Sequence, residues 1–300
     1  MLLGMEIHMW NDRFRCVLAG IALLGFASAS QAAPGLQLDV YNPGEAAAFP
    51  VTSVLVSGEK DAILVDAQFA RPQAEQLVER IRHSGKHLTT IYISHGDPDY
   101  YFGLQAITAA FAQAKVVASA PTVAHIKATM AAKLAYWGPQ MGEGAPSKLI
   151  VPEVMQGNRL TLEGQELQVV GLDGPQPERS FVWIPSIKAV VGGVVLSNNI
   201  HVWMADTQSA ASHQDWLATL ATIQGLKPVT VVPGHYLPGT LNPSQAVEFT
   251  ADYINTFDTQ AAKAKDAAAL IAAMKALYPD LREESSLELS AKVAKGEMQW

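Results

Sequence analysis

Two apolar segments that each end at a histidine limit the possible folds of this chain more than any other feature. The first is Tyr92-Ile-Ser-His95, and the second is Val231-Val-Pro-Gly-His235. Short runs rich in β-branched residues and bounded by Gly or Pro are typical of buried strands that end in tight turns. Side chains that follow such strands project from the edge of a sheet, where layered α/β proteins bind ligands. We therefore expect a fold that brings the two histidines to one edge.

The rest of the chain alternates between strands and helices. Runs of β-branched residues between Gly, Pro, Asn and Asp predict strands at 36–41, 51–56, 62–66, 88–94, 115–118, 159–162, 167–171, 180–184, 189–193 and 229–232. Apolar residues at helical spacing predict helices at 72–84, 104–112 and 122–134, with a loop or lid at 137–148. Because an apolar sheet face must be buried, the simplest arrangement is one α/β domain of two similar halves, with two sheets covered by helices.

The first 32 residues have the features of a secretory signal peptide. Two arginines precede an uncharged apolar run at 16–29, and small residues stand before a predicted cut after Ala32. The run is shorter than the roughly 20 residues that span a bilayer, so an uncleaved membrane anchor is the lesser alternative. We expect a periplasmic or secreted protein that has no membrane association after cleavage. Cys16 is the only cysteine, so the mature chain would have no disulfide and no thiol chemistry.

The charge composition excludes one class of partner. The chain has 28 acidic and 21 basic residues, a net charge of −7, and no basic run. Nucleic-acid binding requires clustered Lys and Arg to neutralise phosphates, so no nucleic-acid partner is expected. With 49% hydrophobic and only 16% charged residues, the chain can bury a substantial core and is not a disordered protein.

Four side chains at the two strand ends are candidate metal ligands. His95, Asp97 and Asp99 are spaced two apart, so an extended turn can direct all three to one side. His235 joins them if the two strand ends meet. Two imidazoles and two carboxylates suit Zn²⁺, and the oxygen-rich set also admits Mn or Fe. The alternative is an ordinary turn in which Asp99 caps the helix that follows.

Several weak motifs, taken in order, resemble those of the metallo-β-lactamase superfamily. They are Leu64-Val65-Asp66, the His-x-Asp-x-Asp-Tyr at 95–100 followed by Phe102-Gly103, the segment 183–193, and the final Pro-Gly-His235. The resemblance covers roughly residues 36–257. It implies an αββα four-layer sandwich at 33–257 that holds one or two zinc ions, with a C-terminal helical extension at 258–300.

The sequence departs from that family's pattern at four positions. Asp97 and Tyr100 stand where the leading motif has its second and last histidines. No histidine occurs at 171–178, where the middle one is expected, and Val194 stands in place of the bridging carboxylate. A dinuclear zinc site is therefore not expected. The remaining four donors predict a site for one ion, with open positions for water and substrate.

The resemblance and the residue types together suggest roles for the site. A metal-bound hydroxide, its pKa lowered toward ~7, would attack a carbonyl carbon. Asp99 or Asp97 would orient the water, and Tyr100 or Tyr101 would hydrogen-bond the developing oxyanion. His201 would contact the substrate, although for it and the tyrosines ordinary packing is the alternative. Either His201 or Asp173 would add a ligand if its loop folds inward.

Two classes of function follow. The first is an exported metal-dependent hydrolase that cleaves an ester, lactone or amide of a small molecule. The second is a metal-free family member that binds a small molecule in the former site. Helices are predicted at 259–277 and 287–298, on either side of Pro279. The apolar stripe of the first is expected to pack on its own domain, with a homodimer contact as the alternative.

Overall fold

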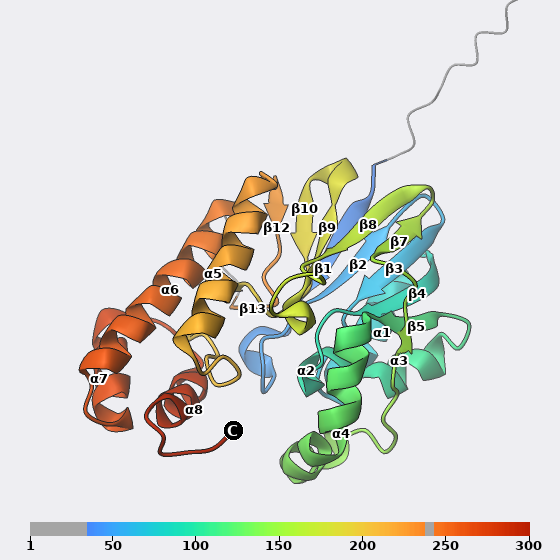
Figure 1. The fold of residues 1–300 in the computed structure, drawn as a ribbon. Coiled ribbons are helices and arrows are strands. Elements are labelled where there is room, and N and C mark those ends of the chain that lie inside the picture. The colour runs from blue at the N-terminus through green and yellow to red at the C-terminus, as the bar shows by residue number, and fades with distance from the viewer. Residues whose placement is uncertain (1–34, 238–242) are drawn as a thin grey trace, which may run out of the picture. The chain divides into compact units, whose positions relative to one another are not determined.

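The computed structural model describes residues 35–237 and 243–300 (Figure 1). The predicted signal peptide at 1–32 lies outside the described residues. Residues 34–300 form one compact unit. Within the described ranges, no helix has both the length and the apolar character needed to cross a membrane.

The first sheet has six strands in sequence order. These are β1 (Gln37–Tyr41), β2 (Ser53–Ser57), β3 (Asp61–Val65), β4 (His87–Ile93), β5 (Lys115–Ala118) and β6 (Glu153–Val154). β1, β2 and β3 pair antiparallel. A short turn joins β2 to β3, and a longer connection with a 3-10 helix at Gly44–Ala46 joins β1 to β2. β3 to β6 pair in parallel, because a helix follows β3 and others follow β4 and β5.

The second sheet has five strands in the order β12-β10-β9-β8-β7. Its members are β7 (Arg159–Leu162), β8 (Gln165–Val170), β9 (Phe181–Ile184), β10 (Ala189–Val191) and β12 (Thr230–Val231). Two further short strands, β11 (Ser197–Asn198) and β13 (His235–Tyr236), pair in parallel beside it. His235 is therefore positioned by the backbone pairing of β13 with β11, in which it lies opposite Ser197.

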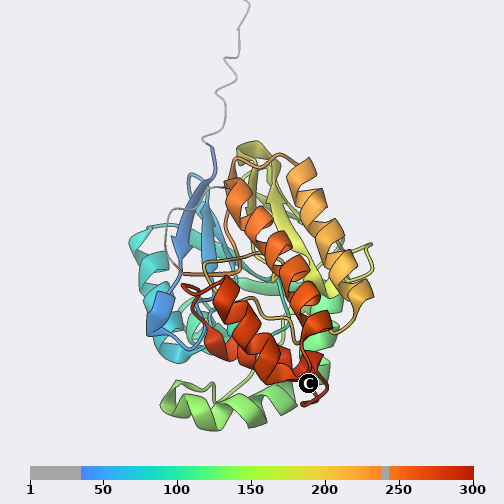
Figure 2. The same ribbon diagram turned by 90° about the vertical axis from the view of Figure 1, so that its left-hand side faces the viewer.

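Helices cover the outer face of each sheet (Figures 1 and 2). On the first sheet these are α1 (Arg71–His83), α3 (Leu104–Ala110) and α4 (Ala120–Met141), with the short α2 (Pro98–Tyr101) before α3. On the second they are α5 (Ala210–Gly225), α6 (Pro243–Lys263), α7 (Ala267–Leu277) and α8 (Glu284–Ala294). Figure 2 shows α6, α7 and α8 lying together.

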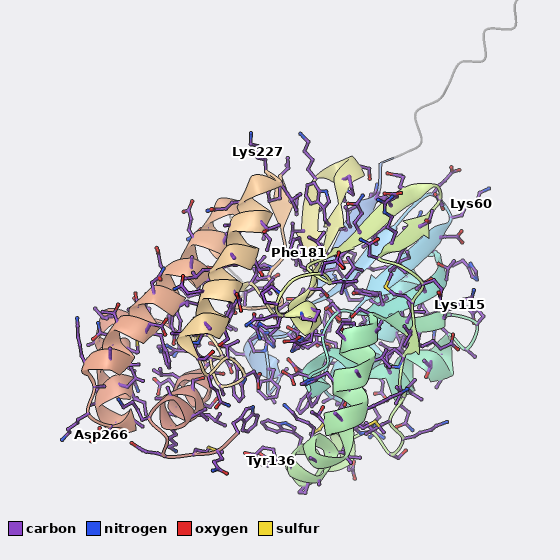
Figure 3. The ribbon with its side chains drawn as sticks, in the orientation of Figure 1. Lys60, Lys115, Tyr136, Phe181, Lys227 and Asp266 are labelled. Carbon is purple, nitrogen blue, oxygen red and sulfur yellow. The ribbon has the colours of Figure 1, made fainter. Side chains whose placement is uncertain are left out.

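Alternating side chains along the strands build three apolar layers. On β3, Leu64 packs in the cluster under α1 and α3, whereas Ile63 and Val65 pack in the cluster between the sheets. On β9, Val182 faces the cluster between the sheets, and Phe181 faces the cluster under α5 and α6 (Figure 3). Period-two alternation with both faces buried is what the β-branched runs predicted. The layers are helix, sheet, sheet and helix, so the expected αββα sandwich is confirmed.

Most predicted boundaries lie within a few residues of the observed ones, but two predicted segments differ more. The segment 137–148 was expected to be a loop or lid, but α4 continues through Pro139 to Met141. Trp137 and Met141 pack against the first core, and their burial outweighs the Gly and Pro content of the segment. The helix predicted at 259–277 is two helices, because Asp266 caps α7 by accepting a hydrogen bond from the Ala269 amide.

The predicted extension at 258–300 packs against the second core. α6 runs across residue 258 without interruption. Leu270 and Met274 of α7 and Leu287 of α8 are buried in the cluster that also contains Phe181. The apolar stripe thus packs on its own domain, as expected.

Candidate functional site

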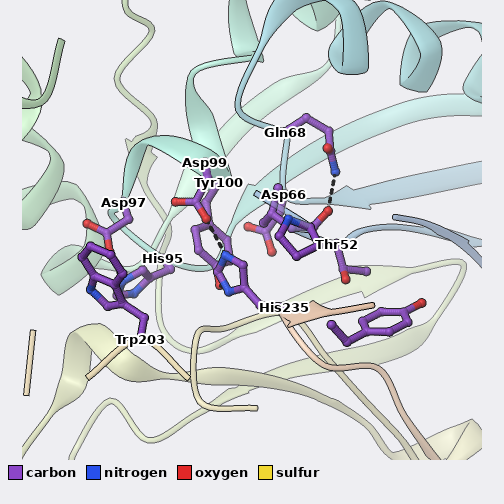
Figure 4. Close-up of polar contacts among 12 residues, drawn as sticks. Thr52, Asp66, Gln68, His95, Asp97, Asp99, Tyr100, Trp203 and His235 are labelled. Carbon is purple, nitrogen blue, oxygen red and sulfur yellow. Dashed lines mark hydrogen bonds and ion pairs between the residues drawn. The ribbon is translucent and has the colours of Figure 1, made fainter. Parts of the chain in front are cut away.

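The loops after the two histidine-bearing strands meet at one edge of the sheets (Figure 4). β4 leads into His95, and His235 begins β13. The carboxylate of Asp66 accepts hydrogen bonds from the Ser94 amide at 2.8 Å and hydroxyl at 2.6 Å. The Ser94 hydroxyl accepts a bond from the Gly193 amide at 2.7 Å, which ties this loop to the one after β10. Burial raises the pKa of Asp66 to about 7, although these bonds oppose the shift.

The four predicted metal ligands lie in this region but form two separate pairs. His95 Nε2 is 3.3 Å from Asp97 Oδ2, and His235 Nε2 is 2.6 Å from Asp99 Oδ2. The Tyr100 ring lies between the pairs, with its centroid 5.2 Å from that of His95 and 5.5 Å from that of His235 (Figure 4). Its hydroxyl is 3.2 Å from His235 Nδ1. The loops converge as expected, whereas the donor atoms stay in pairs.

A backbone hydrogen bond sets the orientation of His95. Its Nδ1 is 3.0 Å from the carbonyl oxygen of Glu178, which can only accept, so Nδ1 carries a proton. Nε2 is therefore the nitrogen turned toward Asp97. A bond of this kind is usual for metal-binding histidines, and it serves a carboxylate-paired histidine equally well.

Side-chain cations surround Asp97. Lys133 of α4 places Nζ 3.0 Å from Asp97 Oδ1, and His125 of the same helix places Nε2 3.7 Å from that oxygen. Burial alone would raise the pKa of Asp97. The imidazoles of His125 and His95 and the Lys133 ammonium outweigh burial and hold this pKa well below its usual range. Asp97 is therefore ionised, and side chains balance its charge.

Arg179 is a second buried cation near the site. It directly follows the segment 171–178 that lacks a histidine, and it is 5% exposed. Its Cζ atom lies 4.2 Å from the ring centroid of Trp216. Among the described residues, nothing accepts a hydrogen bond from its Nε or Nη2. Burial lowers the pKa of Arg179, and the charges of Asp206 and Asp97 oppose that shift.

A pocket opens beside the two pairs. Its empty volume is about 690 Å³, its open mouth included. The aromatic side chains in its wall are Phe49, Trp137, Trp203, Trp216 and Trp300. The ionisable side chains that reach it are Asp97, Asp99, Lys133, His201, His235 and Glu283. A mainly apolar wall with a few polar groups suits a small organic molecule.

Asp206 joins two of these aromatic side chains. One carboxylate oxygen accepts a hydrogen bond from Trp203 Nε1 and the other from Trp300 Nε1, both at 2.7 Å. The two indole rings meet edge to face with centroids 5.2 Å apart, and Lys133 Nζ is 5.1 Å from the Trp300 centroid. Because both indole N–H groups bond within the protein, Trp203 and Trp300 offer apolar faces to a ligand.

The other predicted residues have different surroundings. His201 reaches the pocket wall but is only 1% exposed, and its Nδ1 is 3.0 Å from the Tyr253 hydroxyl. Burial lowers the pKa of His201 to about 4, so its imidazole is neutral near pH 7. Tyr100 and Tyr101 are buried. Asp173 is exposed and does not line the pocket.

The sequence model of the metallo-beta-lactamase superfamily matches residues 46–235. The chain belongs to the metallo-β-lactamase superfamily. Solved structures with a similar fold include a metallo-beta-lactamase from Pontibacter korlensis, at 19% identity over 73% of this chain and 93% of that chain, with a TM-score of 0.47. Others are TMB-1, at 19% identity over 74% and 98% with a TM-score of 0.48, and DIM-1 metallo-beta-lactamase, at 17% identity over 75% and 99% with a TM-score of 0.48. No curated protein matches the sequence.

Members of this superfamily typically bind zinc, but the residues of this chain do not fit that ion. Within 35–237 and 243–300, no three His, Cys, Asp or Glu side chains are grouped so that they could hold a metal. The Lys133 ammonium already contacts Asp97, and the Tyr100 ring separates His95 from His235. The donor types are suitable, but their arrangement is not.

Several residues at the site were not predicted from the sequence. They are His125, Lys133, Arg179 and Trp300, which belong to no motif of the leading or final segments. His125 and Lys133 are two helical turns apart on α4, and only the fold brings them beside Asp97. An i, i+8 spacing of a histidine and a lysine is too common in helices to be a signal by itself.

Proposed function

We propose that this protein binds a small organic molecule in the pocket without a metal ion, on the scaffold of a hydrolase family. One observation carries the proposal: Lys133 Nζ lies 3.0 Å from Asp97 Oδ1, so a side chain supplies the positive charge at the leading motif. A second positive ion beside that ammonium would be repelled at short range in a partly buried site.

The pocket's own residues support binding. Trp203, Trp300 and Trp137 present rings that can pack against the apolar part of a ligand and exclude water. The Asp99–His235 pair supplies polar groups that can fix a ligand's orientation. These groups fit a small organic molecule that has an apolar part and at least one polar group.

A metal-dependent hydrolase acting on an ester, lactone or amide is the second candidate. It is favoured by the bond from His95 Nδ1 to the Glu178 carbonyl, which leaves Nε2 directed into the site. It also agrees with membership of a family in which most members are hydrolases.

A ligand screen with and without chelator separates the two candidates. The protein that starts at residue 33 is mixed with a panel of aromatic esters, lactones and their hydrolysed products, and both thermal shift and turnover are followed. We expect some compounds to raise the melting temperature equally with and without EDTA, and no turnover. Turnover that EDTA abolishes and zinc restores would favour the hydrolase. Trp203→Ala should weaken binding, and Asp173→Ala, an exposed control, should not.

We also propose that the protein is exported, from the sequence features of residues 1–32. Expression of the full chain in a bacterial host, followed by fractionation and intact mass measurement, tests this. A periplasmic or secreted product that begins after Ala32 is expected. A cytoplasmic product that retains residues 1–32 would contradict it.

A further inference from the structure

The strongest unexplained feature of the site is the cluster around Asp97. Asp97 Oδ2 is 3.3 Å from His95 Nε2, and Oδ1 is 3.7 Å from His125 Nε2. Lys133 Nζ is 3.0 Å from the same Oδ1. Two imidazoles and one carboxylate are a set that binds Zn²⁺ and related ions, with positions left open for other ligands. Here the carboxylate of this set is paired with an ammonium.

His125 is the member of this cluster that has no other explanation. Its Nε2 is buried, and the nearest acceptor, Asp97 Oδ1 at 3.7 Å, lies beyond hydrogen-bond distance, so this polar atom is not fully satisfied. Its ring lies over that of His95, with centroids 6.2 Å apart and an interplanar angle of 27°. The approach depends on Gly96, because a Cβ atom there would lie 2.5 Å from His125 Cδ2. The backbone between the two motif residues therefore makes room for this imidazole.

Lys133 is fixed in place from two sides. Its ammonium contacts Asp97 and lies 5.1 Å from the Trp300 ring centroid, a distance within the range of a cation–π contact. The same helix, α4, carries both His125 and Lys133, so the position of the cation relative to the imidazole is set by helix geometry. A long side chain held in this way occupies the space beside Asp97 permanently.

We propose that Lys133 takes the place of a metal ion in this chain. Its ammonium balances Asp97 and keeps divalent cations away from His95, Asp97 and His125, so that a metal site is latent and becomes accessible when Lys133 is removed. The inference rests on the metal-free function proposed above and gives its structural cause. Among the described residues, no three donor side chains are grouped to hold an ion. We expect that loss of the ammonium frees the Asp97 carboxylate and lets the two imidazoles turn toward it.

Zinc binding by Lys133 variants tests the proposal. Lys133→Met keeps an unbranched side chain and removes the charge, whereas Lys133→Arg keeps the charge. Lys275→Met is the matched control, because Lys275 forms a surface pair with Glu284 at 2.7 Å. Each chelator-treated protein starting at residue 33 is incubated with zinc and desalted. Zinc is then counted by mass spectrometry, and melting temperature is measured with and without zinc.

We expect about one zinc per chain and a zinc-dependent rise in melting temperature only in Lys133→Met. The wild type, Lys133→Arg and Lys275→Met should retain almost none. Adding His125→Ala to Lys133→Met should remove the bound zinc, which locates the site. If Lys133→Met does not fold in metal-free buffer, refolding with zinc decides: recovery supports the proposal and failure contradicts it.

Outcomes that would contradict the role of Lys133 differ from those that would contradict the proposed function. A folded Lys133→Met that retains no more zinc than the wild type would overturn the inference and leave the metal-free function standing. The same holds if His125→Ala does not affect the bound zinc. A wild type that retains about one zinc per chain would overturn both, because Lys133 would then exclude nothing.

Discussion

At the scale of single residues, burial rather than catalysis explains His201. Its imidazole is buried with Nδ1 beside the Tyr253 hydroxyl, and burial lowers its pKa from 6.5 to about 4. Between these values the unfolded chain binds a proton that the folded chain does not, so the free energy of unfolding falls as pH drops from about 6.5 to about 4. In His201→Gln, which keeps a hydrogen-bonding side chain but does not titrate, we expect a smaller loss of stability over this window. Urea unfolding at pH 7.5 and 4.5 measures it.

The control for this prediction is His83→Gln, because His83 is exposed on α1. Its pH dependence should match that of the wild type. An unchanged pH dependence in His201→Gln would show that His201 is not the buried neutral group described above.

Glu163 is a residue whose importance no sequence motif indicated. Its carboxylate, in the β7–β8 turn, accepts three backbone hydrogen bonds, from the amides of Glu59 and Lys60 at 2.6 Å and of Asp61 at 2.8 Å. It thereby joins a turn of the second sheet to a turn of the first. We expect Glu163→Ala to lower the melting temperature, because three amides lose a charged acceptor. Glu143→Ala, which changes an exposed carboxylate after α4, should have no comparable effect, and equal melting temperatures in the two variants would contradict this role.

At the scale of elements, α4 is the helix that makes the site unusual. It carries His125, Lys133 and Trp137, and it begins at Ser119, whose side chain accepts a hydrogen bond from the Thr122 amide at 3.2 Å. Ser119→Ala should cost about 1 kcal/mol of stability through loss of this cap. Ser119→Thr, which keeps the capping hydroxyl, should retain most of it. Chemical denaturation of both variants measures the difference, and equal losses would show that the cap contributes nothing.

Some helices, strands and loops could be predicted from the sequence, and others could not. Strands such as β3 and β9 were predictable because continuous apolar runs bounded by turn residues are typical of strands with both faces buried. The loops at His95 and His235 were predictable because Gly and Pro follow apolar runs. The length of α4 was not predictable from the sequence, because burial of Trp137 outweighs the Gly and Pro content of the segment. The pairing of Lys133 with Asp97 was not predictable either, because it depends on contact between segments that are far apart in the sequence.

At the scale of the whole molecule, the C-terminal helices complete the second core. Leu270 of α7 is fully buried there, whereas Leu277 at the end of the same helix is 53% exposed. Leu270→Ala should therefore destabilise the protein by about 2–5 kcal/mol, and Leu277→Ala by much less. Equilibrium unfolding of the two variants compares the same chemical change in two environments. Similar small effects would mean that α7 is not part of the folding unit.

In the proposed function, this member of the metallo-β-lactamase superfamily uses side-chain charge in place of a metal ion. The most direct measurement is the metal content of the wild-type protein from residue 33, purified without a metal-affinity tag and analysed by mass spectrometry after exposure to zinc, manganese and iron. We expect far less than one ion per chain, unchanged in Asp97→Ala and His235→Ala. About one ion per chain, lost in both variants, would contradict it.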